Sequence, residues 1–461
     1  MKKVLIYLFL SAGLFSCSVY KTYKRPDLPI TDSLYRQPAA TVEENQSLAR
    51  FSWKELFTDP FLQQLIETGL QNNTDLQIAR LKVKEAEALL STARLAYLPS
   101  LSLSPQGTLS SSDGQKATQT YNLAAAAEWE LDIFGGLTNA KREAKAVLEQ
   151  SEAYRQAVQT QLVATIANSY YTLLMLDEQY AISQRTAENW AENLRVMEAL
   201  KQAGEATEMA VAQTAASKLS VDASLLSIQQ QISEMENSLS SLLGTAPQTI
   251  ERSTLKAQTF PDTLSTGVPL ELLQRRPDIR QSEAELAAAF YVTNRARAAF
   301  YPTITLSGSA GWTNAAGSAI TNPGQWLFSA VGSLVEPLFK QGSIRANLKV
   351  AKAQQEEALY AFRQALLDAG NEVNNALTQW QTARQRLILD KQQIEALQSA
   401  VRSSELLMRY SSQNYLEVLT ARQTLLQAEL SAVSDHFNEI QGVINLYHAL
   451  GGGYEMEDPL P

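Results

Sequence analysis

The sequence predicts a mainly α-helical chain with a small membrane-spanning β part, built from a helix–strand–strand–helix unit that occurs twice. The first observation is a repeat, because residues 75–104 match residues 278–307 at eight of thirty positions with a constant offset of 203. The second is a pair of segments with alternating apolar and polar residues in each copy, and the third is a long helical segment after them. We therefore expect copies at residues 51–249 and 250–450.

The strands are expected at about residues 98–133 in the first copy and about 301–338 in the second. From Tyr121 to Ile133 every odd-numbered residue is apolar, which is the period of a strand with one apolar and one wet face. Aromatic residues lie toward the ends of these segments, as membrane-interface girdles require: Tyr97, Trp129, Tyr301, Trp312, Trp326 and Phe328. One layer of a soluble β-sandwich shows the same alternation and is the alternative interpretation.

Three acidic residues, Glu128, Glu130 and Asp132, are predicted to share the wet face of this strand. Repeated in several copies around a lumen, they would make an acidic wall that favours cations, although ordinary solvation of the lumen is an equal alternative. Four strands cannot span a membrane alone, because open edges leave backbone groups unsatisfied in lipid. Three copies of the chain would supply twelve strands, an even number that can close into a barrel.

Two segments of 66 residues, 137–202 and 343–408, are predicted to form very long helices. The first contains neither proline nor glycine and would reach roughly 100 Å at 1.5 Å per residue. Apolar residues recur in both at helical spacing, while the other faces carry Glu, Gln, Lys and Arg, which indicates packed helices in an aqueous surrounding. Each helix is expected to turn back, near Gly204 and near Ser411, so that two long hairpins form a helical barrel beneath the strands.

The N-terminus predicts a lipoprotein signal peptide at residues 1–16. Lys2 and Lys3 precede an apolar run that is too short for a permanent membrane helix, and Cys17 follows it as the sole cysteine. We expect Cys17 to carry a covalent lipid, and residues 17–50 to form an extended, anchored segment. The alternative is an ordinary exported protein with a chance cysteine. The composition of residues 451–461 predicts a flexible tail.

Composition argues against several classes of function. The net charge of −9 disfavours nucleic acid as a partner. The two histidines, His436 and His448, are too far apart in sequence for a metal pair one helical turn apart. No phosphate-binding loop or catalytic serine motif is present. We therefore expect neither an enzyme nor a metal protein, and no cofactor other than the lipid on Cys17.

Three segments carry a resemblance to a known family: FSWKELFTDPFLQQLIETGLQNNTDLQIA at residues 51–79, LLQRRPDIRQSEAEL at 272–286, and YLEVLTARQTLLQAEL at 415–430. They resemble signatures of the outer membrane factors, the TolC-like proteins, and most closely the lipoprotein branch that works with RND-type pumps. The resemblance implies a homotrimer whose 12-stranded β-barrel continues into a long periplasmic α-helical barrel. It also implies a location in the outer membrane of a Gram-negative bacterium, in contact with its lipid.

The function implied by the resemblance is a passive exit duct for drugs and other small compounds in a tripartite efflux system. Its partners would be a periplasmic membrane-fusion adaptor and an inner-membrane RND-type pump. Two alternatives stay open: an outer membrane channel for type I protein secretion, and a non-conducting periplasmic scaffold lipoprotein. The strand pattern with its aromatic girdles favours a channel over a scaffold.

The same resemblance implies a gate at the periplasmic helix tips. Glu417 matches an acidic ring of the family, whereas Thr420 stands where a second acidic ring can occur. Gly204 matches the turn glycine of the first tip, and Tyr410 and Gln413 belong to the second tip. Three carboxylates around a narrow axis would repel one another and bind cations; the alternative is that Glu417 is an ordinary solvated carboxylate at a helix end.

Overall fold

The computed structural model describes residues 21–26, 51–111, 117–260, 276–313, 325–410 and 415–452. Of the residues singled out above, Cys17, Ser411 and Gln413 lie outside these ranges, as do the signal peptide and residues 453–461, and only the backbone of Tyr410 is described. The chain forms two compact units. The first comprises residues 1–28, 81–153 and 280–364, and the second comprises residues 29–80, 154–279 and 365–461.

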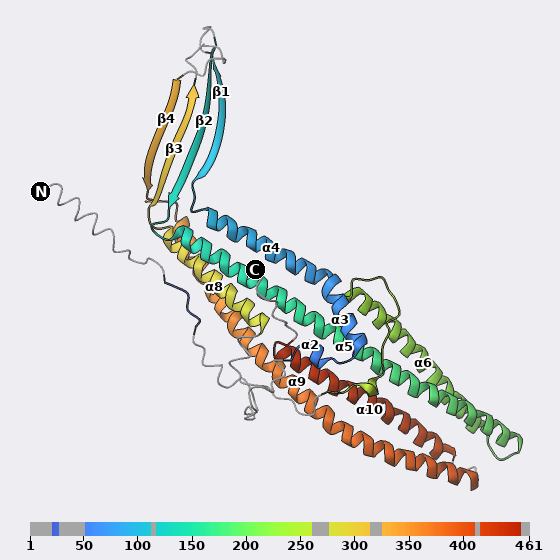
Figure 1. The fold of residues 1–461 in the computed structure, drawn as a ribbon. Helices are drawn as coiled ribbons and strands as arrows, with labels where there is room; N and C mark the ends of the chain where they lie inside the picture. Colours follow the sequence, from blue (N-terminus) through green and yellow to red (C-terminus); the bar gives the residue numbers. More distant parts are fainter. Residues whose placement is uncertain are drawn as a thin grey trace. The chain divides into compact units, whose positions relative to one another are not determined.

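The first unit contains one antiparallel sheet, in the order β1-β2-β3-β4 (Figure 1). Its strands are β1 (Ser100–Ser110), β2 (Thr118–Leu131), β3 (Thr303–Thr313) and β4 (Gln325–Val335). The two hairpins come from the two copies of the repeat, and β2 joins them by pairing with β3, with Leu123 opposite Trp312. Each copy therefore contributes half of one continuous sheet.

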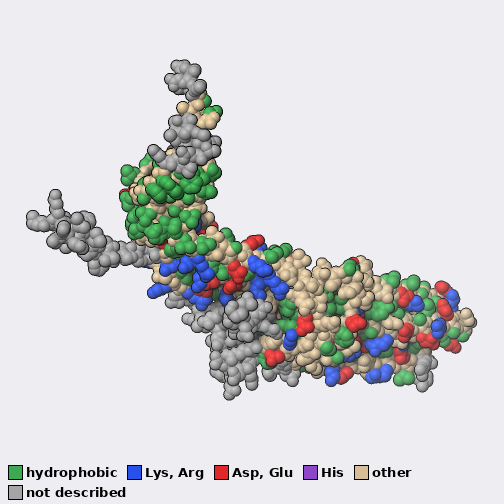
Figure 2. All heavy atoms as spheres, turned by 45° about the horizontal axis from the view of Figure 1, so that its top comes forward, with side chains coloured by type: hydrophobic (Ala, Val, Ile, Leu, Met, Phe, Trp, Pro, Cys, Tyr) green, Lys and Arg blue, Asp and Glu red, His purple; other side chains and the backbone are tan. Residues whose placement is uncertain are grey.

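The register places most of the large apolar residues of the four strands on one face of the sheet. Members of this face are Leu101, Leu103, Leu123, Trp129, Ile304, Leu306, Trp312, Trp326, Phe328 and Leu334. Leu101 is 83% exposed and Phe328 is 76% exposed, and Figure 2 shows hydrophobic side chains gathered over the sheet. An apolar surface of this kind is unfavourable in water, whereas strands of 11 to 14 residues are long enough to cross a bilayer.

The opposite face of the sheet is mostly polar, with β4 as the exception. Ser102 and Ser104 of β1 lie there, in the same row as Ala126 and Ala124 of β2. On β4, however, Leu327 and Val331 occupy this face and are about half exposed. The alternation in β4 is therefore less clean than in the other strands.

Four helices lead into or out of the sheet. α4 (Thr74–Leu95) precedes β1 and α8 (Pro277–Ala298) precedes β3, while α5 (Gly136–Gln202) follows β2 and α9 (Ser343–Tyr410) follows β4. Alanine and straight-chain polar residues dominate all four, and these residues have high helix propensity. The corresponding helices of the two copies have almost the same length, 22 residues for α4 and α8, and 67 and 68 for α5 and α9.

The prediction that Asp132 lies on the wet face of a strand is wrong. β2 ends at Leu131, and the Asp132 carboxylate instead accepts hydrogen bonds from the backbone N–H of Leu137 (2.9 Å) and of Thr138 (2.7 Å). These N–H groups belong to the first turn of α5, where they have no partner within the helix. An acid at this place satisfies them and interacts favourably with the helix dipole, so Asp132 positions α5 after β2.

The segment 21–26 lies along α8. Asn294 donates a hydrogen bond to the carbonyl of Lys21 (3.1 Å), Tyr23 packs edge-on against Phe290, and Arg25 forms an ion pair with Glu283. From Lys21 to Arg25, the segment contacts residues of α8 that lie progressively farther from the sheet. Lys21 is thus the residue of the segment that lies closest to the sheet-side end of α8.

The second unit is helical and contains the main hydrophobic core. Besides the remaining parts of α5 and α9 it contains α2 (Trp53–Leu56), α3 (Pro60–Asn72), α6 (Glu208–Leu242), the 3₁₀ helix η4 (Leu255–Ala257) and α10 (Tyr415–Ala449). The core is formed by fully buried side chains such as Leu62, Ile66, Leu173, Ile444 and Tyr447. Among the described residues, none of the helices combines the length and the apolarity that a membrane crossing requires.

Two buried polar residues connect distant segments of the second unit. Asp59 accepts hydrogen bonds from Tyr170 (2.7 Å), Gln258 (2.9 Å), the backbone N–H of Phe61 (3.0 Å) and Ser253. Arg276 donates to Asp278 (2.6 Å), Glu372 (2.7 Å) and the carbonyl of Ala449 (2.7 Å). Each of these side chains fixes segments that lie far apart in sequence.

Candidate functional site

The first helix tip is a tight turn between α5 and α6. Gly204 adopts a φ of 80°, a left-handed conformation that glycine tolerates best, and its N–H donates to the carbonyl of Lys201 (3.0 Å). Thr207 then caps α6, because its hydroxyl accepts from the N–H of Ala210 (3.2 Å). An ion pair between Lys201 and Glu208 joins the end of α5 to the start of α6. The predicted turn glycine therefore occupies a true turn.

The second helix tip places Glu417 in the first turn of α10, with an exposed side chain. A carboxylate at this position is stabilised by the helix dipole, so a purely local role also fits its place. Thr420 is exposed as well, and its hydroxyl donates to the carbonyl of Leu416 (2.8 Å) within the helix. A role in a gate stays a prediction for both residues.

One hydrogen bond joins the two tips directly. The hydroxyl of Tyr415, the first residue of α10, donates to the side-chain oxygen of Gln213 on α6. Beside it, side chains of α5, α9 and α10 enclose a small apolar cavity, and the residues around it include Trp190, Met197, Met408, Val418 and Leu419. Sequence reasoning missed this contact, since its two residues are 202 positions apart.

A second contact braces the hairpin of α9 and α10 below the tip. Arg422 reaches one carboxylate oxygen of Glu405 with both Nε (3.0 Å) and Nη2 (2.5 Å). Both side chains are partly buried, which shields the pair from solvent. Sequence reasoning missed this pair too. Glu405 and Arg422 carry opposite charges and lie on either side of the expected turn between α9 and α10, and this pattern could have predicted an ion pair across the hairpin.

The two remaining acids of the wet strand face lie where the alternation predicts. Glu128 stands in the same row as Ser100 of β1 and Ser307 of β3, and Glu130 stands opposite Thr305. Both carboxylates are exposed and share the face that carries most of the Ser and Thr residues. This arrangement supplies an acidic patch at the helix-side end of β2, and a lumenal role for it stays a prediction.

Comparison with known proteins gives the class of the molecule. The model of the outer membrane efflux protein family matches residues 65–245 and again residues 268–452, so it finds the two copies of the repeat one after the other. The chain belongs to the outer membrane efflux protein family. Its place is the outer membrane, where it is a channel component of an efflux system.

Known proteins that align with almost the whole chain also belong to export or efflux systems or to the outer membrane. The pyoverdine export outer membrane protein OpmQ of Pseudomonas putida is 31% identical, over 98% of this chain and 97% of the relative. The cation efflux system protein CusC of Escherichia coli is 26% identical over 96% and 97% of the two chains. SilC of Salmonella typhimurium, a probable outer membrane lipoprotein, is 27% identical over 97% of each.

Solved structures show the same fold. The outer-membrane channel OprN has a TM-score of 0.83 at 28% identity, with 95% of this chain and 99% of that chain covered. The open state of the MtrE outer membrane channel of Neisseria gonorrhoeae has a TM-score of 0.85 at 26% identity, with 95% and 98% covered. The predicted fold class, mainly helical with a small β part in a duplicated unit, is confirmed, as is the predicted resemblance.

Proposed function

We propose that three copies of this chain form a passive exit duct for small compounds across the outer membrane. The observation that carries this proposal is the exposed apolar face of the four-stranded sheet. β1 and β4 are its two edges, and an open edge in lipid leaves backbone N–H and C=O groups without partners. Pairing β4 of one copy with β1 of the next removes every edge and gives twelve strands from three copies.

The two faces of the sheet then have different roles. Leu101, Trp129 and Phe328 face the lipid, while Glu128, Glu130 and the Ser and Thr residues line a wet lumen. Two groups of aromatic side chains mark the two ends of the apolar face: Trp129 with Tyr97 next to the helices, and Trp312 with Trp326 and Phe328 at the far end. Trp129 pairs with Leu306, six residues from Trp312, so these groups lie about 20 Å apart at ~3.3 Å per residue. An apolar band of this height suits a membrane barrel.

The duct works within a tripartite system, together with a periplasmic membrane-fusion adaptor and an inner-membrane RND-type pump. Relatives named for the export of pyoverdine and for the efflux of cations and toluene support small solutes as cargo. The chain itself supplies no energy. A covalent lipid on Cys17 anchors the start of the mature chain, which SilC, named as a lipoprotein, also supports. The scaffold alternative leaves the apolar face of the sheet without a partner.

The gate of the duct is proposed at the helix tips. Glu417 would form a ring of three carboxylates, and the hydrogen bond from Tyr415 to Gln213 holds the two tips of one copy together. Adaptor binding would open the duct by separating these contacts. A single neutral hydrogen bond contributes about 1 kcal/mol, so the closed state can be released by modest differences in adaptor affinity.

Single-channel conductance of the purified trimer in a planar bilayer tests the proposal. We compare wild type with Glu417→Ala and Tyr415→Phe, and with Glu357→Ala as a control at an exposed carboxylate away from the tips. We expect small cation-selective openings in wild type, weaker selectivity in Glu417→Ala, and more frequent openings in Tyr415→Phe. Openings that neither tip variant changes would remove the gate but keep the duct. Particles that are not trimeric and never conduct would reject the duct.

A further inference from the structure

Six exposed basic side chains surround the sheet-side ends of the helices. We name them the basic collar: Arg94 at the end of α4, Lys141 and Lys145 in the first turns of α5, and Arg345, Lys349 and Lys352 in the first turns of α9. All six lie within about 15 Å of these helix ends, at 1.5 Å per residue. Figure 2 shows Lys and Arg side chains gathered on the helices next to the sheet.

The collar contrasts with the charge of the whole chain, which is −9. The first ten residues of α9 contain no Asp or Glu. The corresponding part of α5 contains one acid, Glu143, which forms an ion pair with Arg295 (2.9 Å). Burial raises the pKa of the Glu143 carboxyl, and Arg295 opposes that shift. Positive charge is therefore concentrated on these helix ends, whereas the acidic patch of Glu128 and Glu130 at the same end of the sheet lies on its wet face.

Helix energetics explain only part of this concentration. The N-terminal turn of a helix favours acidic residues and disfavours basic ones. Neither α5 nor α9 has an acid in its first turn, and α9 has Arg345 there instead. Arg345 thus occupies a helix end where it does not stabilise the helix. Arg94, in the last turn of α4, is favoured by the dipole there, and Lys145 forms an ion pair with Glu149 one turn later. A partner outside the helices would account for the basic residues that these effects do not explain.

The collar on α5 lies on the same side of the sheet as its apolar face. The Lys141 ammonium lies 5.6 Å from the centre of the Tyr97 ring, and the Tyr97 carbonyl accepts a hydrogen bond from the indole of Trp129 (2.9 Å). Trp129 belongs to the apolar face. Lys145 follows Lys141 by one helical turn on the same face of α5. Both ammonium groups are therefore placed just beyond the apolar surface.

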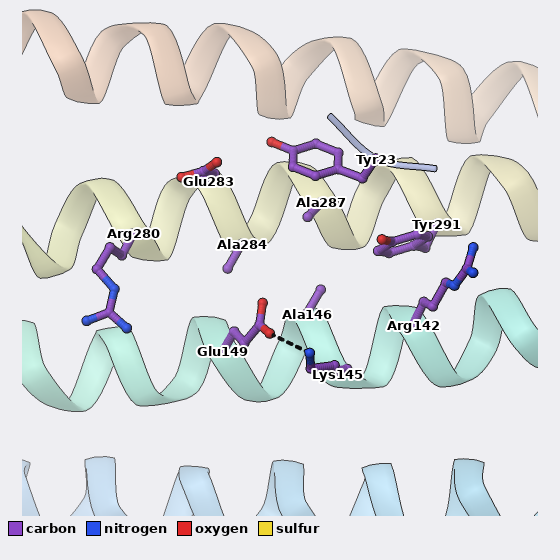
Figure 3. A pocket seen from close by; sticks show the side chains of 10 residues that line it. All are labelled: Tyr23, Arg142, Lys145, Ala146, Glu149, Arg280, Glu283, Ala284, Ala287 and Tyr291. Atoms are coloured by element: carbon purple, nitrogen blue, oxygen red, sulfur yellow. Dashed lines mark ion pairs between the residues drawn. The ribbon is translucent and has the colours of Figure 1, made fainter. Parts of the chain in front are cut away.

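A cavity of about 580 Å³ between α5, α8 and Tyr23 lies next to the collar and includes Lys145 in its lining. At its sheet-side end lie Arg142 and Tyr291, and at its far end lie Arg280, Glu149 and Glu283 (Figure 3). Lys145 lies between them and pairs with Glu149 at 3.4 Å. The far end thus carries charges of both signs, while the sheet-side end presents the basic side chain of Arg142.

We propose that the basic collar binds the phosphates of anionic phospholipids in the periplasmic leaflet of the outer membrane. The proposal rests on the proposed function, in which the sheet crosses that membrane. The collar side chains are spread over three helices within about 15 Å of the sheet, which suits several lipid headgroups better than a single enclosed ion. Lipid held there fixes the depth and orientation of the barrel, in addition to the anchor on Cys17.

Native mass spectrometry of the full-length trimer in detergent tests this surface. Affinities for phosphatidylglycerol and for zwitterionic phosphatidylcholine are compared between wild type, Lys141→Gln/Lys145→Gln, and the control Lys84→Gln/Lys391→Gln, which removes two exposed lysines outside the collar. Each basic residue near an anionic surface contributes ~1 kcal/mol, or about fivefold in affinity. We expect the collar variant to lose at least fivefold affinity for phosphatidylglycerol, with phosphatidylcholine unchanged in all three proteins.

Three outcomes would overturn the proposal: equal loss in the control variant, no loss in the collar variant, or displacement of phosphatidylglycerol by millimolar inorganic phosphate, which would indicate a free-anion site. Binding of an acidic periplasmic protein in place of lipid would also overturn it. Conductance measured on the same samples separates this result from the proposed function. A wild-type trimer that prefers phosphatidylglycerol but does not conduct would reject the duct alone.

Discussion

The two copies of the repeat have the same architecture but are held in place by different chemistry. α6 and α10 are both 35 residues long, and α4 and α8 are both 22 residues long. The first copy, however, is fixed by an acid near its start, because Asp59 accepts hydrogen bonds from Tyr170 of the same copy and from Ser253 and Gln258 of the segment that follows it. The second copy is fixed by a base, because Arg276 donates to two carboxylates and a carbonyl.

This difference shows which properties a duplicated scaffold must keep. Helix and strand lengths set the dimensions of the molecule, so both copies preserve them. The buried polar residues are free to diverge as long as each finds partners, since an unpartnered buried polar group costs about 1–3 kcal/mol. The three-copy assembly that we propose would then alternate two kinds of hairpin around its axis, and the two kinds should respond differently to mutation.

The largest effect is expected at the acid that fixes the first copy. Asp59→Ala leaves the hydroxyls of Tyr170 and Ser253 without their carboxylate acceptor, at a cost of about 3 kcal/mol, whereas the amide of Gln258 keeps the Ser253 hydroxyl and the Thr254 carbonyl. The expected result is a clear fall in the thermal unfolding temperature of the detergent-solubilised protein. Arg276→Ala should cost less, because its partners Asp278 and Glu372 are about half exposed and can be solvated, so that only the buried carbonyl of Ala449 loses a donor that water does not replace. An equal fall in the unfolding temperature of the two variants would contradict the proposed difference between the copies.

Acid titration sharpens this prediction. Burial would raise the pKa of the Asp59 carboxyl, but hydrogen bonds from Ser253, Tyr170, Phe61 and Gln258 outweigh burial and lower the pKa below its usual value. The ionised form therefore stabilises the fold fully above the usual pKa, and this stabilisation is lost as pH falls through the lowered pKa. The difference in unfolding temperature between wild type and Asp59→Asn should persist to pH 4 and shrink only below it.

The next largest effect is expected where the two copies join in the sheet. A Cβ at Gly311 of β3 would lie 2.3 Å from the carbonyl oxygen of Leu123 and 2.6 Å from Cα of Ala124, both backbone atoms of β2. Gly311→Ala must therefore push β2 and β3 apart, at a cost of about 2 kcal/mol. The matched control is Gly308→Ala, whose Cβ meets only the carbonyl oxygen of Ser329 at 3.5 Å. Size-exclusion chromatography and thermal unfolding should show less trimer for the first variant alone.

Sequence reasoning predicted those parts of the fold that a local pattern encodes. The alternation from Tyr121 predicted β2 and its apolar face, and the absence of helix breakers predicted α5. The same alternation led to the error at Asp132, because a period of two continues past Leu131 although the strand ends there. Only the proximity of Asp132 to a helix start could have indicated a cap instead of a strand residue.

Contacts between distant segments could not be predicted in the same way. The pairing of β2 with β3 depends on Gly311 fitting against β2, and no local pattern in either strand records that fit. The hydrogen bond between Tyr415 and Gln213 depends on the angle at which two helices meet. Polar residues on helix faces are common, so their partners become known only when the helices are placed.

A smaller effect is expected at the first helix tip. Gly204→Ala places a Cβ in open space, so the change costs only the strain of a left-handed backbone, about 1–2 kcal/mol. Hydrogen exchange at residues 200–210 should quicken while the core of the second unit stays protected. Gly107→Ala is the control, because its Cβ also meets nothing and its φ is not positive. Quicker exchange in both variants would mean that backbone strain at the tip is not the cause.

The smallest effect, and the one that most directly separates the two copies, concerns a pair of acids present in the second copy alone. Asp390 of α9 and Asp435 of α10 are both buried, and Arg386 contacts Asp435 at 2.9 Å. When the starts of α5 and α9 and of α6 and α10 are aligned, Ser183 and Ile228 occupy the corresponding places in the first copy. A carboxyl pair thus stands where the first copy has no charge.

Burial raises the pKa of Asp390, and the neighbouring Asp435 raises it further, against the opposing effect of Arg386. An acid whose pKa is raised on folding destabilises the fold at pH 7, and this cost disappears as pH falls through the raised pKa. Asp390→Asn should therefore raise the unfolding temperature at pH 7 by the equivalent of about 0.5 kcal/mol, with the gain vanishing toward pH 4. Ser183→Asn, the matched change in the first copy, should give no pH-dependent gain. A gain that is the same at every pH would show that Asn improves packing, whereas a pH-dependent gain confined to Asp390 would assign the charge difference between the copies to this pair.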